Sequence, residues 1–329
     1  MTASREHLAV VHSARYQVDI GLHVFPTAKY QLIVNRLITQ GVVTASHVVE
    51  PEPASWDELA LVHTPEYLTK LRDGTLTDED LTQLELPWSI EMVEGFRTMV
   101  GGTIAAARIV CGLSKLELET SNSKESSSSK FGVQTSNFRV VCHVGGGLHH
   151  AFPNHGEGFC PFNDVAVAVR VLQGLGVERH AIVDLDVHHG NGTAFIFERD
   201  PRVHTLSLHQ QHNYPMWKPR GTHDVGLPDG VHDATYLREL EKVLPDVFAH
   251  RPECVFYLAG ADPFEDDQLG GLRLTRDGLR RRDRMVIDAV AAARLPLVVV
   301  LAGGYARNIE DTVAIHCGTI EEAIGKFQL

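Results

Sequence analysis

The sequence predicts an α/β fold in which helices flank a central parallel sheet, organised as a single domain of 329 residues. Four short, nearly continuous apolar runs are typical of parallel strands, which are buried on both faces. These runs lie at 140–141, 181–183, 255–258 and 297–301. Segments with helical spacing of apolar residues alternate with the runs, and this alternation favours a parallel sheet. The sequence contains no internal repeat.

The remaining elements follow in chain order. A first strand is expected at 8–11. Helices are expected at 26–38, 101–110, 165–172 and 237–248. The first of them has Pro26 in its opening turn, where proline is favoured. The last two have apolar residues at i, i+3, i+4 and i+7, and Asp233 is the expected N-cap of the fourth.

Residues suited to chemistry follow directly after each of the four apolar runs. They are His149 and His150, then the segment from Asp184 to His188, then Asp262 and finally Tyr305. An open α/β sheet binds its ligands in the crevice beyond the carboxyl ends of its strands. The imidazoles, carboxylates and phenol are therefore expected to meet at one edge of the sheet, as in a metal hydrolase.

Asp186, His188 and Asp262 are the candidate metal ligands. Side chains two residues apart on an extended backbone share a face, so Asp186 and His188 can bind one cation, with Asp184 behind them. Two carboxylates and one imidazole with an open position suit a catalytic Zn²⁺. For any single residue the alternative is a cap or a hydrogen-bonded core position, but four coincident strand ends favour a site.

His149 and His150 are candidates for acid–base catalysis. Hydrolysis of an amide needs a base for the attacking water and an acid for the leaving amine, and the ordinary pKa of histidine, roughly 6.5, suits both. Asp184 and Asn191 are expected to orient the outer ring nitrogens. A neutral amide makes His150 the less basic of the two. Tyr305 is expected to donate its phenol to an oxyanion.

Composition and charge limit the classes of function. The net charge is −12 and no long basic run occurs, so direct binding to nucleic acid is not expected. No apolar stretch approaches the roughly 18 to 20 residues of a membrane span. Five cysteines without a Cys-x-x-Cys pair, and an amino terminus without a secretory signal, favour the cytosol or nucleus.

The Ser-rich segment 117–137 is expected to be a disordered insertion. His209, His212 and His223 are expected in a loop near the site as structural residues.

Five motifs, in this order, resemble the zinc-dependent histone deacetylase superfamily. They are His149-His150-Ala, Gly158-Phe159-Cys160-Pro-Phe-Asn163-Asp164, Asp184-x-Asp186-x-His188-His189-Gly-Asn191-Gly, Ala-Gly-Ala-Asp262 and Gly-Gly-Tyr305. The resemblance covers nearly the whole chain outside 117–137. Segments such as His23-Val-Phe-Pro-x-x-Lys29-Tyr30 and Leu269-Gly-Gly-Leu272 are similar to the class IV branch and its bacterial relatives.

The resemblance implies an arginase/deacetylase fold, with about eight parallel strands flanked by helices. It implies that Asp186, His188 and Asp262 hold zinc, that the two histidines move protons, and that Tyr305 polarises the amide of an Nε-acyl-lysine in a protein or peptide. The residues implied to bind substrate are Gly158, through its carbonyl, and Phe159, Tyr214, Leu269, Gly303 and Gly304. A structural potassium ion would be held by backbone oxygens of Asp184, Asp186, His188, Ser207 and Leu208.

Two positions depart from the family pattern. Asn191 stands where most classes have Asp, so His150 lacks a carboxylate partner, and Ala302 replaces the first of three glycines before the tyrosine. Three alternatives stay open. One is a deacetylase of small acylated amines such as acetylpolyamines, and another is a catalytically weak binding scaffold. The third is a ureohydrolase of the same fold, disfavoured because Gly190 and Phe264 stand where a second metal would need carboxylates.

Overall fold

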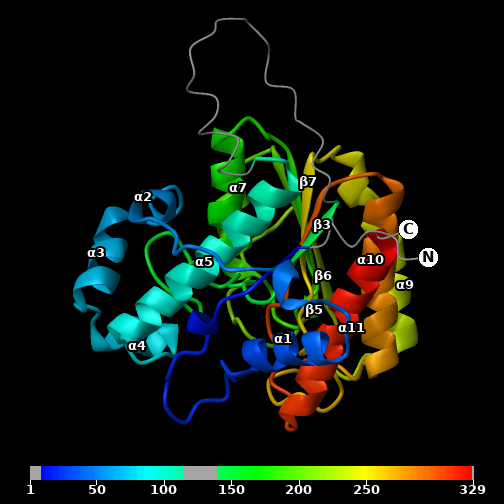
Figure 1. Cartoon of the computed structure of the whole chain (residues 1–329), viewed down its shortest axis with the longest axis horizontal. Helices are drawn as coiled ribbons and strands as arrows, with labels where there is room; N and C mark the ends of the chain where they lie inside the picture. The colour runs from blue at the N-terminus through cyan, green and yellow to red at the C-terminus, as the bar shows by residue number, and fades with distance from the viewer. Residues whose placement is uncertain (1–8, 114–138, 328–329) are drawn as a thin grey trace, which may run out of the picture.

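The computed structural model describes residues 9–113 and 139–327; Leu8 and the predicted insertion at 117–137 lie outside this part. Its centre is a parallel sheet with helices around it (Figure 1). The sheet has eight strands in the order β2-β1-β3-β8-β7-β4-β5-β6. The strands are β1 (Ala9–Val11), β2 (Val48–Val49), β3 (Val140–His143), β4 (His180–Asp184), β5 (Val203–Gln210), β6 (His223–Leu227), β7 (Cys254–Leu258) and β8 (Leu297–Val300). The predicted parallel sheet of about eight strands is confirmed.

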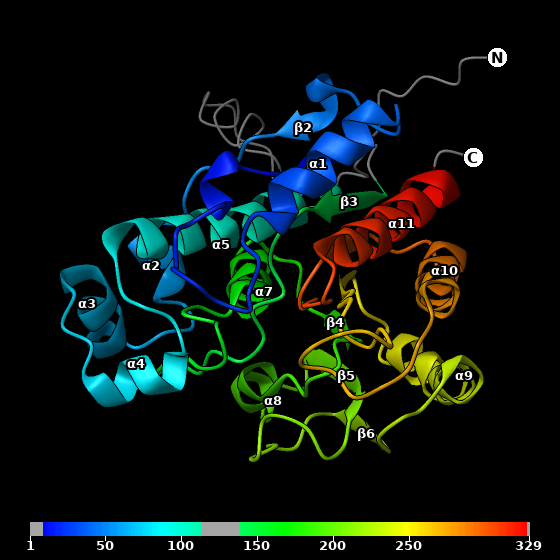
Figure 2. The same cartoon turned by 90° about the horizontal axis from the view of Figure 1, so that it is seen from below.

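Helices cover both faces of this sheet, as Figure 2 shows. One layer consists of α1 (Lys29–Thr39), α9 (Asp233–Ala249), α10 (Arg276–Ala292) and α11 (Ile309–Phe327). The other consists of α5 (Ile90–Val110), α7 (Asp164–Gly174) and α8 (Asn191–Phe197). Three short helices, α2 (Trp56–Leu59), α3 (Pro65–Asp73) and α4 (Asp78–Leu84), lie beside α5, and two 3₁₀ turns, η2 (Ala14–Tyr16) and η3 (Ala45–His47), complete the amino-terminal part.

The middle of the sheet is the most deeply buried part of the core. Every residue of β3, β4, β7 and β8 is buried, because helices cover these strands on both faces. Removing apolar side chains from water stabilises such a core by about 25 cal/mol per Å². The same four strands are direct neighbours in the order β3-β8-β7-β4. Their carboxyl ends therefore lie side by side.

The predicted helices are present, with three corrections. The helix expected at 101–110 is the carboxyl-terminal part of α5, which begins at Ile90. The apolar spacing predicted for α7 and α9 is confirmed by the buried faces of both helices. Helix α1 begins at Lys29 rather than Pro26, because Pro26 forms a preceding turn whose carbonyl accepts the Lys29 N–H at 2.9 Å. Asp233 is the first residue of α9 rather than its N-cap. Its carboxylate accepts instead from the N–H and hydroxyl of Thr275, the N-cap of α10.

Two histidines expected in a loop lie in strands. His209 is in β5 and His223 begins β6. Strand β5 is buried throughout although it alternates polar and apolar residues, and its polar groups are partly paired internally, as in the 3.0 Å contact between Ser207 Oγ and His209 Nδ1. A buried strand that carries polar side chains lacks the continuous apolar run from which the four central strands were predicted.

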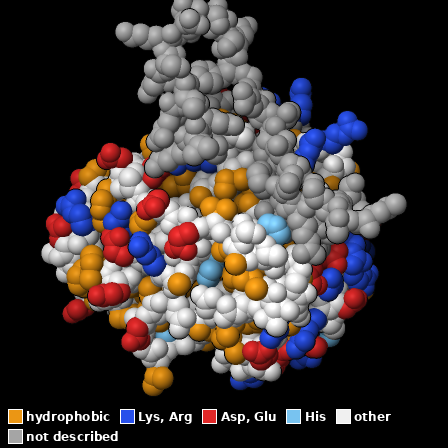
Figure 3. Space-filling model, viewed as in Figure 1, with side chains coloured by type: hydrophobic (Ala, Val, Ile, Leu, Met, Phe, Trp, Pro, Cys, Tyr) orange, Lys and Arg blue, Asp and Glu red, His pale blue; other side chains and the backbone are white. Residues whose placement is uncertain are grey.

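The outer surface carries mixed charge. On the face drawn in Figure 3, acidic and basic side chains are interspersed, so the described residues of that face form no continuous basic surface of the kind nucleic acids bind. Within the described ranges, no helix combines the length and the apolar character needed to cross a membrane.

Candidate active site

The register of the sheet aligns four strand ends. Asp184 of β4 pairs with Leu258 of β7, Leu258 pairs with Val300 of β8, and Val300 pairs with His143 of β3. The candidate catalytic and metal-binding residues all follow these ends, except for Asp184 itself. Sequence segments more than 150 residues apart therefore meet at one edge of the sheet, as predicted.

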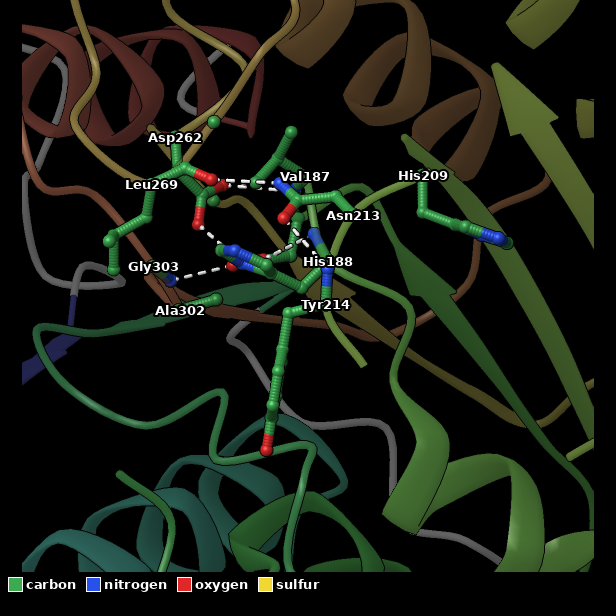
Figure 4. Close-up of polar contacts among 12 residues, drawn as sticks. Val187, His188, His209, Asn213, Tyr214, Asp262, Leu269, Ala302 and Gly303 are labelled. Atoms are coloured by element: carbon green, nitrogen blue, oxygen red, sulfur yellow. Dashed lines mark hydrogen bonds and ion pairs between the residues drawn. The ribbon is translucent and has the colours of Figure 1, made fainter. Parts of the chain in front are cut away.

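Asp186, His188 and Asp262 form a buried cluster at this edge, and Figure 4 labels His188 and Asp262. Asp186 Oδ1 lies 3.0 Å and Asp262 Oδ2 lies 3.3 Å from His188 Nδ1. One ligand atom from each residue falls within 4.8 Å of the others, and the described residues contain no second cluster of this kind. The three predicted ligands are thus brought together.

Backbone groups hold the two carboxylates in place. The Gly303 N–H donates to Asp186 Oδ2 at 2.8 Å, and the Val187 N–H donates to Asp262 Oδ1 at 2.9 Å. Gly303 must be glycine, because a Cβ there would lie 1.9 Å from Asp262 Oδ2 and 2.6 Å from Asp186 Oδ2. These contacts leave the remaining oxygens directed at the centre of the cluster.

A fully buried arginine supports the same loops from the core. Arg282 of α10 donates through Nη1 to the carbonyls of Leu185, at 3.2 Å, and Gly260, at 2.6 Å. Its charge is balanced by Asp283, which also accepts from the hydroxyls of Tyr257 and Thr319. One guanidinium therefore joins the loops that carry Asp186 and Asp262.

The donor set fits a divalent cation. Asp262 Oδ2 is buried and has no hydrogen-bond partner among the described residues. Burial and repulsion from Asp186 raise the pKa of Asp262 to about 7. Burial would lower the pKa of His188, but the carboxylates of Asp186 and Asp262 raise it to about 10. This concentrated negative potential suits a metal ion, and one imidazole with two carboxylates is a ligand set of catalytic zinc sites.

His149 and His150 lie next to the cluster and are oriented differently. His149 Nδ1–H donates to Asp184 Oδ2, and His150 Nδ1–H donates to Asn191 Oδ1, both at 2.7 Å. Their Nε2 atoms are 3.1 Å apart. Burial would lower the pKa of His149, but Asp184 and Asp186 raise it to about 9. Burial and the neighbouring histidines hold the pKa of His150 well below its usual range.

The turn that carries the two histidines depends on glycine. Gly147 has φ +82°, and a Cβ there would lie 2.5 Å from Ala302 Cα. The buried carboxylate of Asp164 accepts from the N–H groups of Gly147, at 3.1 Å, and Leu148, at 2.7 Å. This anchor in α7 fixes the backbone immediately before His149.

A pocket of about 160 Å³ leads to the cluster. Its lining residues are Glu85, His150, Gly158, Phe159, His188, Asn213, Tyr214, Leu269 and Tyr305. Phe159 has φ +66°, which is unusual for a bulky side chain and typical of functional sites. It stacks on Phe25 with the ring centroids 6.0 Å apart, and it meets the edge of Tyr305. Burial raises the pKa of Tyr305 well above its usual value, so its phenol stays a hydrogen-bond donor.

The other predicted substrate and ion residues lie nearby. Gly303 faces the carboxylate cluster, and a Cβ on Gly304 would meet Ala261 and Thr312, so both support the site from behind. Asp184 and Ser207 are paired across β4 and β5, in the region of the predicted potassium site. His209 points away from the cluster (Figure 4) and stays outside it.

Sequence reasoning missed three polar residues of the site. Glu85 and Asn213 line the pocket, and Glu157 lies behind Asn191. All three are outside the four strand ends, and none belongs to a spacing pattern. Glu157 precedes the Gly158-Phe159 motif, and that adjacency was the one available signal.

Residues 23–320 match the family model of the histone deacetylase domain. The chain belongs to the histone deacetylase family. The match includes the three candidate metal ligands, the histidine pair and every residue that lines the pocket. Members of this family are amide hydrolases, which supports a deacetylase activity for the histone deacetylase domain described above.

Relatives of this histone deacetylase domain come from several kingdoms. An uncharacterized protein of Picosynechococcus sp. is 41% identical over 296 residues, covering 89% of this chain and 90% of the relative. Histone deacetylase 2 of Arabidopsis thaliana is 29% identical over 323 residues, covering 93% and 77%. A probable deacetylase of Archaeoglobus fulgidus is 32% identical over 293 residues, covering 83% and 73%.

A solved structure confirms the fold of this histone deacetylase family member. The crystal structure of the HDA15 HD domain matches with a TM-score of 0.74 and 26% sequence identity, covering 97% of this chain and 88% of that one. The arginase/deacetylase fold implied by the sequence resemblance is therefore confirmed.

Proposed function

We propose that the protein is a zinc-dependent deacylase that hydrolyses Nε-acyl-lysine side chains. The observation that carries the proposal is the position of the Asp186, His188 and Asp262 cluster beside two histidines, at the inner end of a narrow pocket. The ligand set, the family and the burial of the cluster all favour zinc. The family resemblance adds a potassium ion on the backbone oxygens of Asp184, Asp186, His188, Ser207 and Leu208.

A zinc ion held by this cluster would supply Lewis-acid polarisation of the acyl carbonyl and activation of a water molecule. His150, whose pKa is lowered, is suited to accept a proton at Nε2 from that water. His149, whose pKa is raised to about 9 by Asp184 and Asp186 against the effect of burial, is suited to protonate the leaving amine. Tyr305 donates its phenol O–H to the developing oxyanion.

The pocket walls suit an alkyl chain with an amide at its end. Phe159, Tyr214 and Leu269 provide apolar surface along the pocket, and water exclusion there strengthens the hydrogen bonds to the reacting amide. The family resemblance implies that the carbonyl of Gly158, a residue that lines the pocket, accepts the substrate N–H. A lysine side chain has the slender apolar stem that such a pocket requires.

A second candidate substrate class is favoured by Glu85. Its exposed carboxylate is the single acidic group among the residues that line the pocket. A carboxylate at the entrance attracts either backbone N–H groups of a peptide or the second ammonium group of an acetylpolyamine. We prefer a peptide substrate. The net charge of −12 favours basic protein partners, and lysine-rich peptides are of this kind.

A substrate panel tests both candidates. Purified protein reconstituted with zinc is assayed on an acetyl-lysine peptide, a myristoyl-lysine peptide and an acetylpolyamine, with mass spectrometry of the products and Asp186→Ala as the metal-deficient control. We expect kcat/KM on one of the peptides to exceed that on the polyamine by at least about 10-fold, a difference of about 1.4 kcal/mol in transition-state binding. Preferential turnover of the polyamine would transfer the assignment to the second class. If protein that holds one zinc per chain hydrolyses none of these substrates, the binding scaffold is the alternative that remains.

The cysteines support an intracellular site of action. All five are free and buried, in agreement with a reducing compartment such as the cytosol or nucleus.

A further inference from the structure

The side-chain amide of Asn191, which orients His150, also contacts the carboxylate of Glu157. Asn191 Nδ2 donates to Glu157 Oε1 at 2.6 Å, while Asn191 Oδ1 accepts from His150 Nδ1 at 2.7 Å. The amide therefore bridges an imidazole and a carboxylate. His150 has no direct carboxylate partner, as the sequence predicted, yet a charged group is connected to it through Asn191.

Donors from three parts of the chain hold Glu157 in this position. Tyr214 Oη donates to the same oxygen, Oε1, at 3.1 Å. The other oxygen, Oε2, accepts from Gln83 Nε2 at 3.2 Å and lies 3.4 Å from His155 Nε2. Burial raises the pKa of Glu157, but these hydrogen bonds together lower it below its usual value. The group is consequently an ionised carboxylate with acceptor atoms alone.

An acceptor at this place decides which way the Asn191 amide points. An asparagine side chain offers an oxygen on one side and an NH₂ group on the other, and either could face an imidazole. The Glu157 carboxylate can pair with the NH₂ group alone, so the oxygen must face His150. His150 then carries its hydrogen at Nδ1, which leaves Nε2, 3.1 Å from His149 Nε2, without a hydrogen and able to accept a proton.

We propose that Glu157 is a positioning residue that fixes the orientation of Asn191 and, through it, the tautomer of His150. It also ties this pair to the pocket wall, because Glu157 Oε1 is shared between Asn191 and Tyr214, whose ring meets the His150 ring edge-on at 5.0 Å. Figure 4 shows the Tyr214 hydroxyl directed away from His188, which is the direction this role requires. The proposal rests on the proposed deacylase function for its kinetic readout.

Exchanging the carboxylate and the amide between positions 157 and 191 tests whether Glu157 acts through Asn191. In Glu157→Gln, either the oxygen or the NH₂ group of the new amide can face Asn191, because Gln83 and His155 on the Oε2 side can each donate or accept. Asn191 is then no longer held with its oxygen toward His150. In Asn191→Asp, two carboxylates face each other across 2.6 Å. The double variant restores one donor and one acceptor, because the introduced amide donates to the introduced carboxylate, which in turn accepts from His150. Its net charge is that of the parent.

We expect each single variant to lose at least about 10-fold in kcat with KM changed less than about 3-fold, and the double variant to recover most of the loss. The second readout is the ¹⁵N spectrum of histidine-labelled, zinc-loaded protein, with the His150 signals assigned from a His150→Gln variant. The Nδ1–H tautomer should be the single form in the parent and the double variant, and Glu157→Gln should show the Nε2–H form beside it. Thermal midpoints of all variants verify folding.

The outcomes separate this proposal from the proposed function. Two results would overturn the assignment and show that Glu157 merely anchors its loop. One is a loss of kcat in the double variant equal to the product of the two single losses. The other is an unchanged His150 tautomer in Glu157→Gln. If the parent protein hydrolyses no acylated substrate, the deacylase function fails, and the spectrum alone still decides whether Glu157 sets the tautomer.

Discussion

Replacing Gly303 by alanine is expected to disable the metal cluster while leaving the fold intact. The added Cβ would lie 1.9 Å from Asp262 Oδ2 and 2.6 Å from Asp186 Oδ2. Gly303 is not among the glycines with positive φ, so its backbone accepts an alanine and the effect falls on the two carboxylates. Real Cβ contacts are essentially never shorter than 3.0 Å, and the Asp262 oxygen must therefore move by about 1 Å or more.

The size of the effect follows from metal geometry. A shift of about 1 Å is several times the tolerance of about 0.2 Å in metal–ligand distances. Loss of an orienting partner alone weakens metal binding by about 10- to 100-fold, so we expect zinc affinity to fall by at least about 100-fold. Zinc at about 100 times the parent Kd stabilises the parent by about 2.7 kcal/mol, and the variant at the same concentration by about 0.4 kcal/mol. At about 2 °C per kcal/mol, zinc should raise the Tm of the parent by about 5 °C and that of the variant by less than about 1 °C.

The assay is a thermal scan with and without zinc, combined with a competition titration against a chromophoric chelator. Gly174→Ala in α7 is the matched control, because a Cβ there meets nothing within 4 Å, and its zinc-dependent shift should equal that of the parent. Asp186→Ala, which deletes a ligand, sets the lower limit. Parental zinc affinity in Gly303→Ala would refute the assignment of these two carboxylates as ligands.

Three further results are expected. Tyr305→Phe should lower kcat by about 100-fold or more with unchanged zinc content and circular dichroism, since it removes an oxyanion donor, and near-parental kcat would exclude the phenol from catalysis. Burial lowers the pKa of His63 to about 4, and its ring nitrogens pair with the Phe152 carbonyl and the Asn163 N–H. The unfolded chain therefore binds a proton that the folded chain excludes. Urea titrations should show the free energy of unfolding falling by on the order of 3 kcal/mol between about pH 6.5 and 4, and falling less in His63→Gln. If the free energy of unfolding had the same pH dependence in the parent and in His63→Gln, this interpretation would be contradicted. Ala302 has φ +54°, and Ala302→Gly should change stability by less than about 1 kcal/mol, because relief of strain and the added freedom of the unfolded chain oppose each other; a larger loss in urea would show that the alanine methyl is needed for packing.

The sequence was sufficient to predict the residues at the ends of the four central strands. Buried parallel strands have continuous apolar runs, and polar residues directly after such runs have few structural reasons to be there. The sheet order could not be predicted, because strand pairing is a long-range property. That order is what places the end of β8, with Gly303 and Tyr305, between the ends of β3 and β7.

Sequence analysis could not find the polar site residues that lie outside the four strand ends. Glu157 and Glu85 lie in connections without a periodic pattern, and their importance depends on Asn191 and on the pocket. Asp233 was predicted to cap its own helix, yet its carboxylate pairs with Thr275 at the start of another helix. His209 was placed in a loop because β5 carries polar side chains and has no continuous apolar run, although the whole strand is buried.

The guanidinium of Arg282 has a consequence for how the protein meets a cation. Because it joins the carbonyls of Leu185 and Gly260 from within the core, the separation of the loops bearing Asp186 and Asp262 is set by the hydrophobic packing of α10 against the sheet. We therefore expect the proposed metal site to need little reorganisation when it binds an ion, and a larger ion to strain the core. Ion selectivity at this site is then expected to depend partly on packing around α10, which carries none of the proposed ligands.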